Sequence, residues 1–346
     1  MKILVVGAGG REHALAWKLA QSERIQMVYV APGNGGTAAD PRLVNVEITD
    51  PAQLADFVVA EHIALTLVGP EVPLAAGIVN LFRSRGLKIF GPTREAAQLE
   101  SSKDFAKSFM QRHGIPTARY QSFTDAELAH VYIDQQGAPI VIKADGLAAG
   151  KGVVVAMSLD DAHSAVDDML ADNRYGDAGA RIVIEEFLAG EEASFIVMCD
   201  GKNVLPLATS QDHKRLKDQD EGPNTGGMGA YSPAPIVTPE MHARVMREVI
   251  NPTIQGMAKD GIVFTGFLYA GLMIDDKGTP RTLEFNCRMG DPETQPIMAR
   301  LKSDLVTVME SCSACADGTA AFLMNANCVF DMVRFRRSGQ SALRKT

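Results

Sequence analysis

The sequence of 346 residues lacks the features of membrane-spanning, secreted and nucleic-acid-binding proteins. It has no run of about 18 apolar residues, the length that a transmembrane helix requires. The apolar run at residues 3–6 is too short for the core of a signal peptide. Positive charge is in deficit, since 34 Lys and Arg face 42 Asp and Glu. Binders of nucleic acid or anionic membrane normally carry a basic patch, so we expect neither partner and predict a cytoplasmic protein.

Cysteine is also sparse. Five cysteines in a chain of this length do not form the disulfide framework of a small secreted protein. Cys312 and Cys315 form a CxxC pair, but no second CxxC or CxxH lies nearby, which argues against zinc. Hydrophobic residues make up 46% and charged residues 22%, as in ordinary globular proteins. Division of the chain length by about 150 residues per domain predicts two domains, within a range of one to three.

The first hundred residues alternate between strand and helix patterns. Strands are expected at 2–6, 27–30, 65–68 and 88–90, with helices at 11–21, 52–61 and 75–85. This alternation predicts an α/β domain with a doubly wound parallel sheet. Ligands of such sheets bind beyond the carboxyl ends of the strands. The turns at 9–12, 34–36 and 69–71 are therefore expected to line one edge.

The rest of the chain has an α+β pattern up to about residue 310. Helices are expected at 101–113, 159–170 and 239–260, and strands at 139–143, 153–157, 181–187, 193–199, 268–275 and 282–285. The polar segment 211–235 is longer than ordinary loops, and such loops are often functional. From about residue 312 the periodicity is lost, and the sequence becomes basic and rich in cysteine.

A glycine-rich turn, Gly7-Ala8-Gly9-Gly10-Arg11-Glu12, follows the first expected strand. It resembles the dinucleotide fingerprint GxGxxG, but Glu12 stands at the third glycine position, so the signal for NAD is weak. Bare amides at a helix N-terminus bind anions, and Arg11 would add positive charge. We favour phosphate binding here. The alternative is a tight turn that needs glycine only for its backbone angles.

Two further segments suit a nucleotide. Lys143 ends a strand, and a loop with Gly150, Lys151 and Gly152 follows, which could cover phosphates although it is not a Walker A motif. A flexible hairpin is the alternative. Glu185, Glu186 and Glu192 end or follow the next strand, where a carboxylate could reach ribose hydroxyl groups; a solvated acidic face is the alternative.

The segment 283–288 has the spacing of a metal-binding strand. Residues i and i+2 share a face of a strand, so Glu284 and Asn286 project oxygen atoms together while Phe285 faces the core. Two such donors with phosphate oxygens suit Mg²⁺. Arg288, further along the same side, could stabilise charge on a transferring group. The alternative is a surface strand with an Arg–Glu pair.

Seven motifs together resemble the ATP-grasp superfamily and, within it, the glycinamide ribonucleotide synthetase family. They are VGAGGREHALAW at 6–17, APGNGGT at 31–37, VGPEVPL at 68–74, IKADGLAAGKGV at 142–153, SQDHKR at 210–215, GPNTGGMGAYSPAP at 222–235 and LEFNCRMGDPETQP at 283–296. The resemblance covers residues 1–310. It implies an N-terminal domain at 1–102 and an ATP-grasp domain at 103–315 with a lid at about 121–190. The divergent tail, 316–346, stands where the family has a further domain. We expect a reading-frame shift or a truncation there, with a natural short form as the alternative.

The resemblance also implies a set of site residues. Those for ATP are Lys103, Lys143, Gly150, Lys151, Gly152, Glu185, Glu186 and Glu192, and those for Mg²⁺ or Mn²⁺ are Glu284 and Asn286. Those for the substrates are Gly9, Gly10, Arg11, Glu12, Asn34, Glu71, Asp212, Lys214, Pro223, Asn224, Thr225, Gly226, Gly227, Arg288 and Asp291. Arg288, Lys143 and Asp212 would be catalytic.

The implied activity is ATP-dependent ligation of glycine to 5-phosphoribosylamine through glycyl phosphate, a step of purine biosynthesis. A monomer is expected. The alternatives are another ATP-grasp carboxylate–amine ligase, an inactive nucleotide-binding form and, more distantly, an NAD oxidoreductase.

Overall fold

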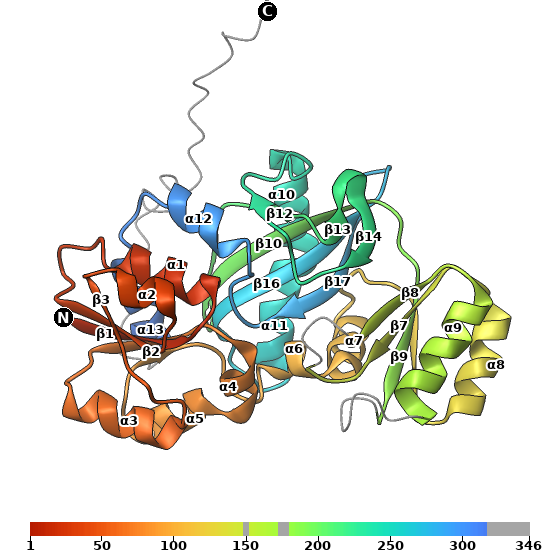
Figure 1. The fold of residues 1–346 in the computed structure, drawn as a ribbon. Helices are drawn as coiled ribbons and strands as arrows, with labels where there is room; N and C mark the ends of the chain where they lie inside the picture. Colours follow the sequence, from red (N-terminus) through yellow and green to blue (C-terminus); the bar gives the residue numbers. More distant parts are fainter. Residues whose placement is uncertain (148–151, 172–179, 317–346) are drawn as a thin grey trace, which may run out of the picture.

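A computed structural model describes residues 1–147, 152–171 and 180–316 (Figure 1). The first hundred residues form the predicted parallel sheet, with strand order β3-β2-β1-β4-β5. Its strands are β1 (Lys2–Gly7), β2 (Met27–Pro32), β3 (Leu43–Asn45), β4 (Leu65–Val68) and β5 (Ile89–Phe90). Its helices are α1 (Gly10–Leu19), α2 (Gly35–Ala39), α3 (Pro51–Ala60), α4 (Glu71–Ala76) and α5 (Ile78–Ser84).

Successive side chains of β1 point to opposite faces of the sheet, and both faces are covered. Ile3 and Val5 pack with Leu15 of α1, whereas Leu4 and Val6 belong to a separate core, because successive strand residues face opposite sides. Figure 1 shows α1 and α2 on one face and α3 and α5 on the other. The helix expected at 75–85 is divided instead, since Gly77 adopts a left-handed conformation (φ 90°) that ends α4.

The central sheet is antiparallel, with order β11-β10-β16-β17. Its strands are β10 (Glu191–Asp200), β11 (Val204–Pro206), β16 (Thr265–Ile274) and β17 (Pro280–Asn286). One face is covered by α10 (Pro239–Val245), η4 (Met246–Ile250) and α11 (Asn251–Lys259). These three follow one another where a single helix was expected, and η4 is a π-helical turn before Pro252, which lacks an N–H group.

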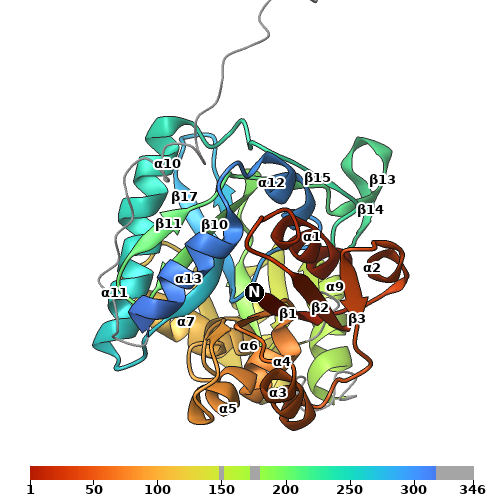
Figure 2. The ribbon, with the colours of Figure 1, turned by 90° about the vertical axis from the view of Figure 1, so that its left-hand side faces the viewer.

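The other face of the central sheet packs against the N-terminal domain and two helices that the sequence did not predict. These are α12 (Thr294–Arg300) and α13 (Leu305–Ala316). Figure 2 shows α13 near the N-terminal sheet, and its Val306, Met309 and Cys312 are buried in the core shared with that domain. The loss of helical structure expected from residue 312 is therefore wrong for 312–316. Residues 317–346 lie outside the described residues.

The third sheet forms a separate layer at the right of Figure 1, with order β6-β9-β7-β8. Its strands are β6 (Tyr120–Phe123), β7 (Ile140–Ala144), β8 (Val153–Ala156) and β9 (Ile182–Glu186). It packs against α8 (Ala126–Gln136), α9 (Leu159–Val166) and the π-helical turn η1 (Asp167–Ala171). The connection from the N-terminal domain runs through α6 (Gln98–Ser101) and α7 (Lys103–Arg112).

The segment 211–235, expected as a loop, contains two small pairs of strands. β12 (Gln211–Asp212) pairs with β15 (Ala230–Tyr231), and β13 (Arg215–Lys217) pairs with β14 (Glu221–Asn224), with the short 3-10 helix η3 (Asp218–Asp220) between the last two. Among the described residues, no helix has the length and apolar character needed to cross a membrane.

Gly266 of β16 meets the N-terminal domain closely enough to give a stability prediction. Its φ is +108°, and a Cβ there would lie 2.8 Å from Cα of Gly91. We expect Gly266→Ala to lower the free energy of unfolding by about 3 kcal/mol or more, because left-handed strain and backbone overpacking add. Urea unfolding measures this loss.

Gly86 provides the matched control. Its φ is +70°, and nothing lies within 4 Å of the place that a Cβ would occupy there. Gly86→Ala should therefore cost only the strain, about 1–2 kcal/mol. Equal losses in the two variants would show that Gly266 is not required by the close contact with Gly91.

Candidate active site

The first three turns of the N-terminal sheet meet at one edge, as predicted. The side chain of Asn34 links two of them, since Nδ2 donates to the carbonyl of Ala8 (2.9 Å) while Oδ1 accepts from the amide of Thr37 and caps α2. The amide of Gly69 donates to the carbonyl of Val6 (2.9 Å). Asn34 thus fixes the shape of the edge.

The buried carboxylate of Glu12 occupies the middle of this edge. The amide of Gly9 donates to Glu12 Oε2 (2.6 Å). A Cβ at Gly7, Gly9 or Gly69 would lie 2.8 Å or less from an atom of Glu12. Three glycines are therefore needed to make room for one carboxylate, and that carboxylate already accepts the Gly9 amide that a GxGxxG turn would offer to a pyrophosphate. This geometry disfavours the NAD alternative.

Arg11 does not project into the turn as expected. Its guanidinium is buried, pairs with Glu12 Oε1 and donates to the carbonyl of Met289 (3.2 Å). The expectation of bare amides with a free Arg11 charge is therefore wrong for Gly9 and Arg11. Arg11 instead connects the glycine turn to the segment that follows β17.

Three of the predicted motifs come together around that segment. Asp291 lies beside the glycine turn, because its Oδ2 accepts from the amide of Arg11 (3.4 Å) and would lie 3.3 Å from a Cβ at Gly9. On its other side, Gly227 adopts φ +121°, and a Cβ there would lie 2.4 Å from Pro292 and 3.5 Å from Asp212. The motifs at 6–17, 222–235 and 283–296 thus converge on one site.

The loop that approaches Pro292 is held by its own hydrogen bonds. Thr225 Oγ1 donates to the carbonyl of Lys214 (2.9 Å) and accepts from the amide of Gly227 (3.1 Å). Pro223 and Asn224 belong to β14, and Gly226 is exposed. The five predicted substrate residues at 223–227 therefore run from the end of β14 into a turn, which brings Gly227 close to Asp212.

Arg288 joins the N-terminal domain to the strand expected to bind metal. It donates to Glu71 (3.2 Å) and to Asn286 Oδ1 (3.1 Å), and its ion pair with Glu100 measures 2.9 Å. Glu100 also accepts from the amide of Cys287 (2.7 Å). Sequence reasoning missed Glu100, since it belongs to no recognisable motif.

Burial and charge act in opposite directions on this cluster. Burial raises the pKa of Glu100, more than Arg288 lowers it. Burial also disfavours the charged form of Arg288, but Glu100 and Glu71 outweigh it and raise the pKa of the guanidinium. For Glu71, burial acts upward while Arg288 and Arg11 bring the pKa below its ordinary value. A cation at position 288 therefore stabilises two acidic groups.

Glu284 and Asn286 lie side by side on β17, as the spacing predicted. Asn286 Nδ2 is 3.5 Å from Glu284 Oε1, and Phe285 between them is buried in the core. Desolvation by the surrounding protein disfavours the charged form of Glu284 and acts to raise its pKa. The positive charges of Lys214, Lys143 and Lys103 outweigh this effect and hold the pKa below its usual value. Glu284 is therefore an anion in a ring of three lysines.

Lys214, one of these three lysines, follows β12 and is paired with Asp212 of that strand. Lys214 Nζ lies 3.2 Å from Asp212 Oδ2 and 3.8 Å from Glu192 Oε2. Burial opposes the charge of Lys214, yet Tyr269, Asp212, Glu284 and Glu192 raise its pKa. Burial raises the pKa of Glu192. These groups lie around Glu284, which is one of the two residues expected to bind a metal.

The lysines expected to bind phosphates are held between α7 and the third sheet. Lys103 Nζ donates to the carbonyl of Gly146 (2.9 Å), and Lys143 Nζ lies 2.9 Å from Glu185 Oε1. Burial lowers the pKa of Lys103. Gly152 is buried, whereas Gly150 and Lys151 lie outside the described residues.

Glu185 and Glu186 do not stand free at the end of β9. The Glu185 side chain is only 3% exposed and pairs with Lys143 and Lys107. Glu186, on the opposite face, pairs with Arg119 (3.2 Å) and Arg281 (3.5 Å). Both carboxylates are thus paired with cations of the chain itself. Lys107 was not predicted, because its sequence context carries no motif.

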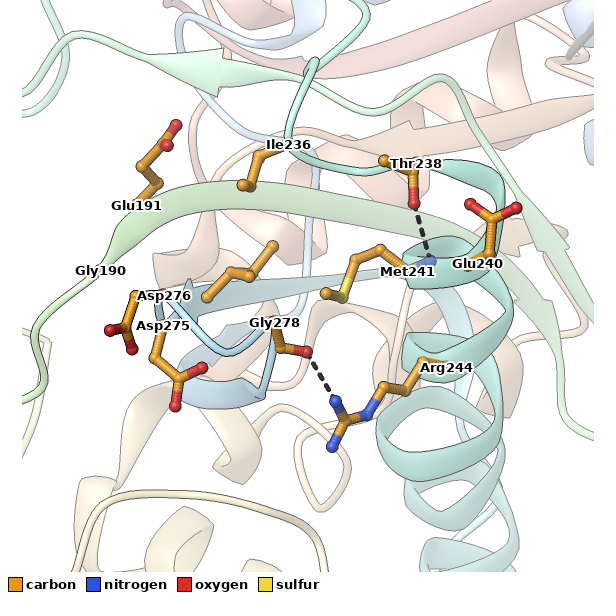
Figure 3. Close-up of a pocket in the computed structure, with 11 residues that line it drawn as sticks. Gly190, Glu191, Ile236, Thr238, Glu240, Met241, Arg244, Asp275, Asp276 and Gly278 are labelled. Carbon is orange, nitrogen blue, oxygen red and sulfur yellow. Dashed lines mark hydrogen bonds between the residues drawn. The ribbon is translucent and has the colours of Figure 1, made fainter.

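A pocket of about 670 Å³ lies elsewhere, between α10 and the ends of β10 and β16 (Figure 3). Ile236 and Met241 line it together with acidic residues and Arg244, which donates to the carbonyl of Gly278 (2.6 Å). None of the predicted site residues lines this pocket. The candidate active site is therefore defined by the converging motifs.

Comparison with known proteins identifies the family. Residues 1–100 match the family described as phosphoribosylglycinamide synthetase, N domain, and residues 101–294 match phosphoribosylglycinamide synthetase, ATP-grasp (A) domain. A protein of Ralstonia nicotianae named phosphoribosylamine–glycine ligase is 76% identical over 310 residues, which are 90% of this chain and 74% of that protein. The Escherichia coli K12 protein of the same name is 67% identical, over 88% of this chain and 72% of its own length.

Solved structures agree with this assignment. The crystal structure of phosphoribosylamine–glycine ligase from Thermotoga maritima superposes with a TM-score of 0.77 at 33% identity, covering 92% of this chain and 76% of that one. A biotin carboxylase of Campylobacter jejuni, with a TM-score of 0.67 at 16% identity over 92% of this chain and 71% of that one, shares the fold alone. The chain thus belongs to the phosphoribosylglycinamide synthetase family, whose ATP-grasp domain here follows an N-terminal parallel-sheet domain.

Proposed function

We propose that this protein joins glycine to 5-phosphoribosylamine, coupled to the cleavage of ATP to ADP and phosphate, and so forms glycinamide ribonucleotide for purine biosynthesis. The observation that carries this proposal is the convergence of Gly227, Pro292 and Asp212. Lys214, which pairs with Asp212, also acts on Glu284, the neighbour of Asn286. A site for two substrates thereby adjoins the lysines proposed for phosphates. The relatives named phosphoribosylamine–glycine ligase support the same reaction.

The chemistry proceeds in two steps. An oxygen of the glycine carboxylate attacks the γ-phosphorus of ATP, which releases ADP and leaves glycyl phosphate. The amine of phosphoribosylamine then attacks the acyl carbon, loses a proton and expels inorganic phosphate. Negative charge accumulates on oxygen in both steps, so the site needs fixed cations more than a protein nucleophile.

The cations of the site match these two steps. Lys143 and Lys103 lie near Glu284 and would bind the phosphates of ATP. Arg288, held by Glu71 and Glu100, would stabilise the acyl phosphate. The carboxylate of Asp212, paired with Lys214, would accept a hydrogen bond from a substrate amine.

The residues present also fit a divalent cation. Glu284 offers carboxylate oxygens, and Asn286 Oδ1 keeps a second lone pair beside the one that Arg288 uses. Two protein oxygens suffice when nucleotide phosphates supply others, as is common for Mg²⁺. Within the described ranges no group of three or more His, Cys, Asp or Glu could hold a metal. Bound there, Mg²⁺ or Mn²⁺ would neutralise phosphate charge.

Three finer expectations are part of this proposal. The break between α6 and α7 at Ser102 supports a division into 1–102 and 103–315. The separate sheet of β6, β7, β8 and β9, with its own core, supports a lid at about 121–190. We expect the protein to be a monomer, and sedimentation of the purified protein tests this expectation. A cytoplasmic location is tested by fractionation of cells that express it.

The proposed function is tested by measuring ADP formation with each substrate omitted in turn. We expect turnover only when ATP, glycine and phosphoribosylamine are all present. Turnover with another carboxylate and none with glycine would indicate a different ATP-grasp ligase. Binding of ATP without turnover would indicate an inactive nucleotide-binding form.

A further inference from the structure

The buried side of α7 carries a lysine that the proposed reaction does not use directly. Lys103 and Lys107 are four residues apart and therefore share a face of this helix. Lys103 reaches the glycine-rich loop, whereas the Lys107 side chain is only 3% exposed. Burial of a lysine ammonium group costs free energy unless the group is paired and hydrogen-bonded, so Lys107 requires partners in the core.

Lys107 is fixed by partners from two other elements. Its Nζ lies 2.7 Å from Glu185 Oε2 of β9 and donates to Thr117 Oγ1 (2.8 Å). Thr117 Oγ1 in turn donates to the carbonyl of Thr282 (2.7 Å), two residues before Glu284 on β17. Lys107 therefore stands where α7, the third sheet and the strand proposed to bind metal meet.

Glu185 divides its two oxygens between two lysines. Oε2 is engaged by Lys107, and Oε1 lies 2.9 Å from Lys143 Nζ. The second contact lacks the geometry of a hydrogen bond, and Oε1 has no hydrogen-bond partner within the described part of the chain. Lys143 Nζ thus pairs with Glu185 through charge and donates a hydrogen bond to the carbonyl of Leu283 (3.3 Å).

We propose that Lys107 is a positioning residue for nucleotide binding, which acts through Glu185 on the ammonium group of Lys143. The inference rests on the proposed function, because that function places Lys143 on the phosphates of ATP. Lys107 holds Glu185 in an orientation that leaves the N–H groups of Lys143 available. Without Lys107, the carboxylate would turn to Lys143, accept hydrogen bonds from it and compete with the nucleotide.

Substitution of Lys107 by methionine tests this with ADP and Mg²⁺ as the probe, in calorimetry on the whole chain. We expect Lys107→Met to raise the Kd for ADP about tenfold, equivalent to about 1.4 kcal/mol. Lys259→Met removes the same charge from an exposed position at the end of α11 and should leave the Kd unchanged. A Kd of Lys107→Met within twofold of the original value would overturn the proposal.

A double-mutant cycle separates positioning from a general loss of structure. In a Glu185→Gln background, Lys107 has no carboxylate through which to act, so Lys107→Met should change the Kd by less than about twofold. The same tenfold loss in both backgrounds would contradict action through Glu185.

A pH series on the unsubstituted protein keeps the proposal testable if Lys107→Met does not fold. Burial, opposed by Glu185, lowers the pKa of Lys107 to about 8. Lys103 of α7, Lys143 of β7 and Glu284 of β17 are the other charged groups that face this pair. ADP binding should weaken as the pH rises through 8, and a constant Kd from pH 7 to 9.5 would contradict the proposal. Absence of glycine-dependent turnover would instead contradict the proposed function, and leaves these binding measurements valid.

Discussion

Glu284→Gln is expected to abolish metal-dependent ADP formation, with kcat reduced about a thousandfold, because a bound cation contributes several kcal/mol to charge neutralisation. The substitution removes the charged member of the oxygen pair formed with Asn286 and leaves Lys214, Lys143 and Lys103 facing a neutral group. ADP formation is measured at increasing concentrations of MgCl₂ and MnCl₂. EDTA should stop turnover of the unsubstituted protein.

Glu240→Gln is the matched control for this experiment. Glu240 is an exposed carboxylate at the start of α10, and it lines the pocket of Figure 3 rather than the site. Its substitution should leave both kcat and the metal dependence unchanged. If Glu284→Gln retained the full metal response, the assignment of the metal to β17 would be wrong.

Arg288→Met is expected to affect activity and stability together. Activity should fall about a thousandfold, as after loss of a strong transition-state contact. The free energy of unfolding should decrease by about 3–5 kcal/mol, because Glu100 loses its cation while it stays buried. Urea unfolding and ADP formation measure the two effects.

The stability loss of Arg288→Met should depend on pH. Burial already raises the pKa of Glu100, and Arg288 is the main group that lowers it. Without Arg288 the pKa rises further, so the folded state takes up a proton more readily than the unfolded state. The loss relative to the unsubstituted protein should therefore shrink as the pH falls from 8 to 5.

A second substitution separates the two roles of Arg288. Arg288→Met combined with Glu100→Gln removes the buried charge and should recover most of the stability, while activity stays low. Recovery of activity along with stability would contradict a role of Arg288 in the reaction. A stability loss that Glu100→Gln does not relieve would contradict the ion pair as its cause.

The elements that position the site follow from local sequence signals. The alternation of strand and helix patterns over the first hundred residues predicted a sheet covered on both faces, and the i, i+2 spacing predicted the shared face of Glu284 and Asn286. Both signals are local in the sequence. The same reasoning failed at 211–235. The glycine and proline residues of this segment are typical of loops, so the two pairs of short strands were not predicted.

The residues that support the site were not predictable in this way. Glu100 and Lys107 act through partners 188 and 78 positions away, Arg288 and Glu185, so only tertiary packing reveals them. Glu12 differs, since its presence at the third glycine position was visible in the sequence. The structure shows the consequence: the carboxylate accepts the hydrogen bond of the Gly9 amide and fills the space beside Gly7, Gly9 and Gly69.

The most direct test of the proposed reaction follows the oxygen atoms of glycine. If a carboxylate oxygen of glycine attacks the γ-phosphorus of ATP, that oxygen leaves with the phosphate in the second step. With glycine labelled by ¹⁸O in its carboxylate, mass spectrometry should find one ¹⁸O atom in each inorganic phosphate released. Glycine-dependent turnover that releases unlabelled phosphate would contradict the glycyl phosphate intermediate and the account of the site built on it.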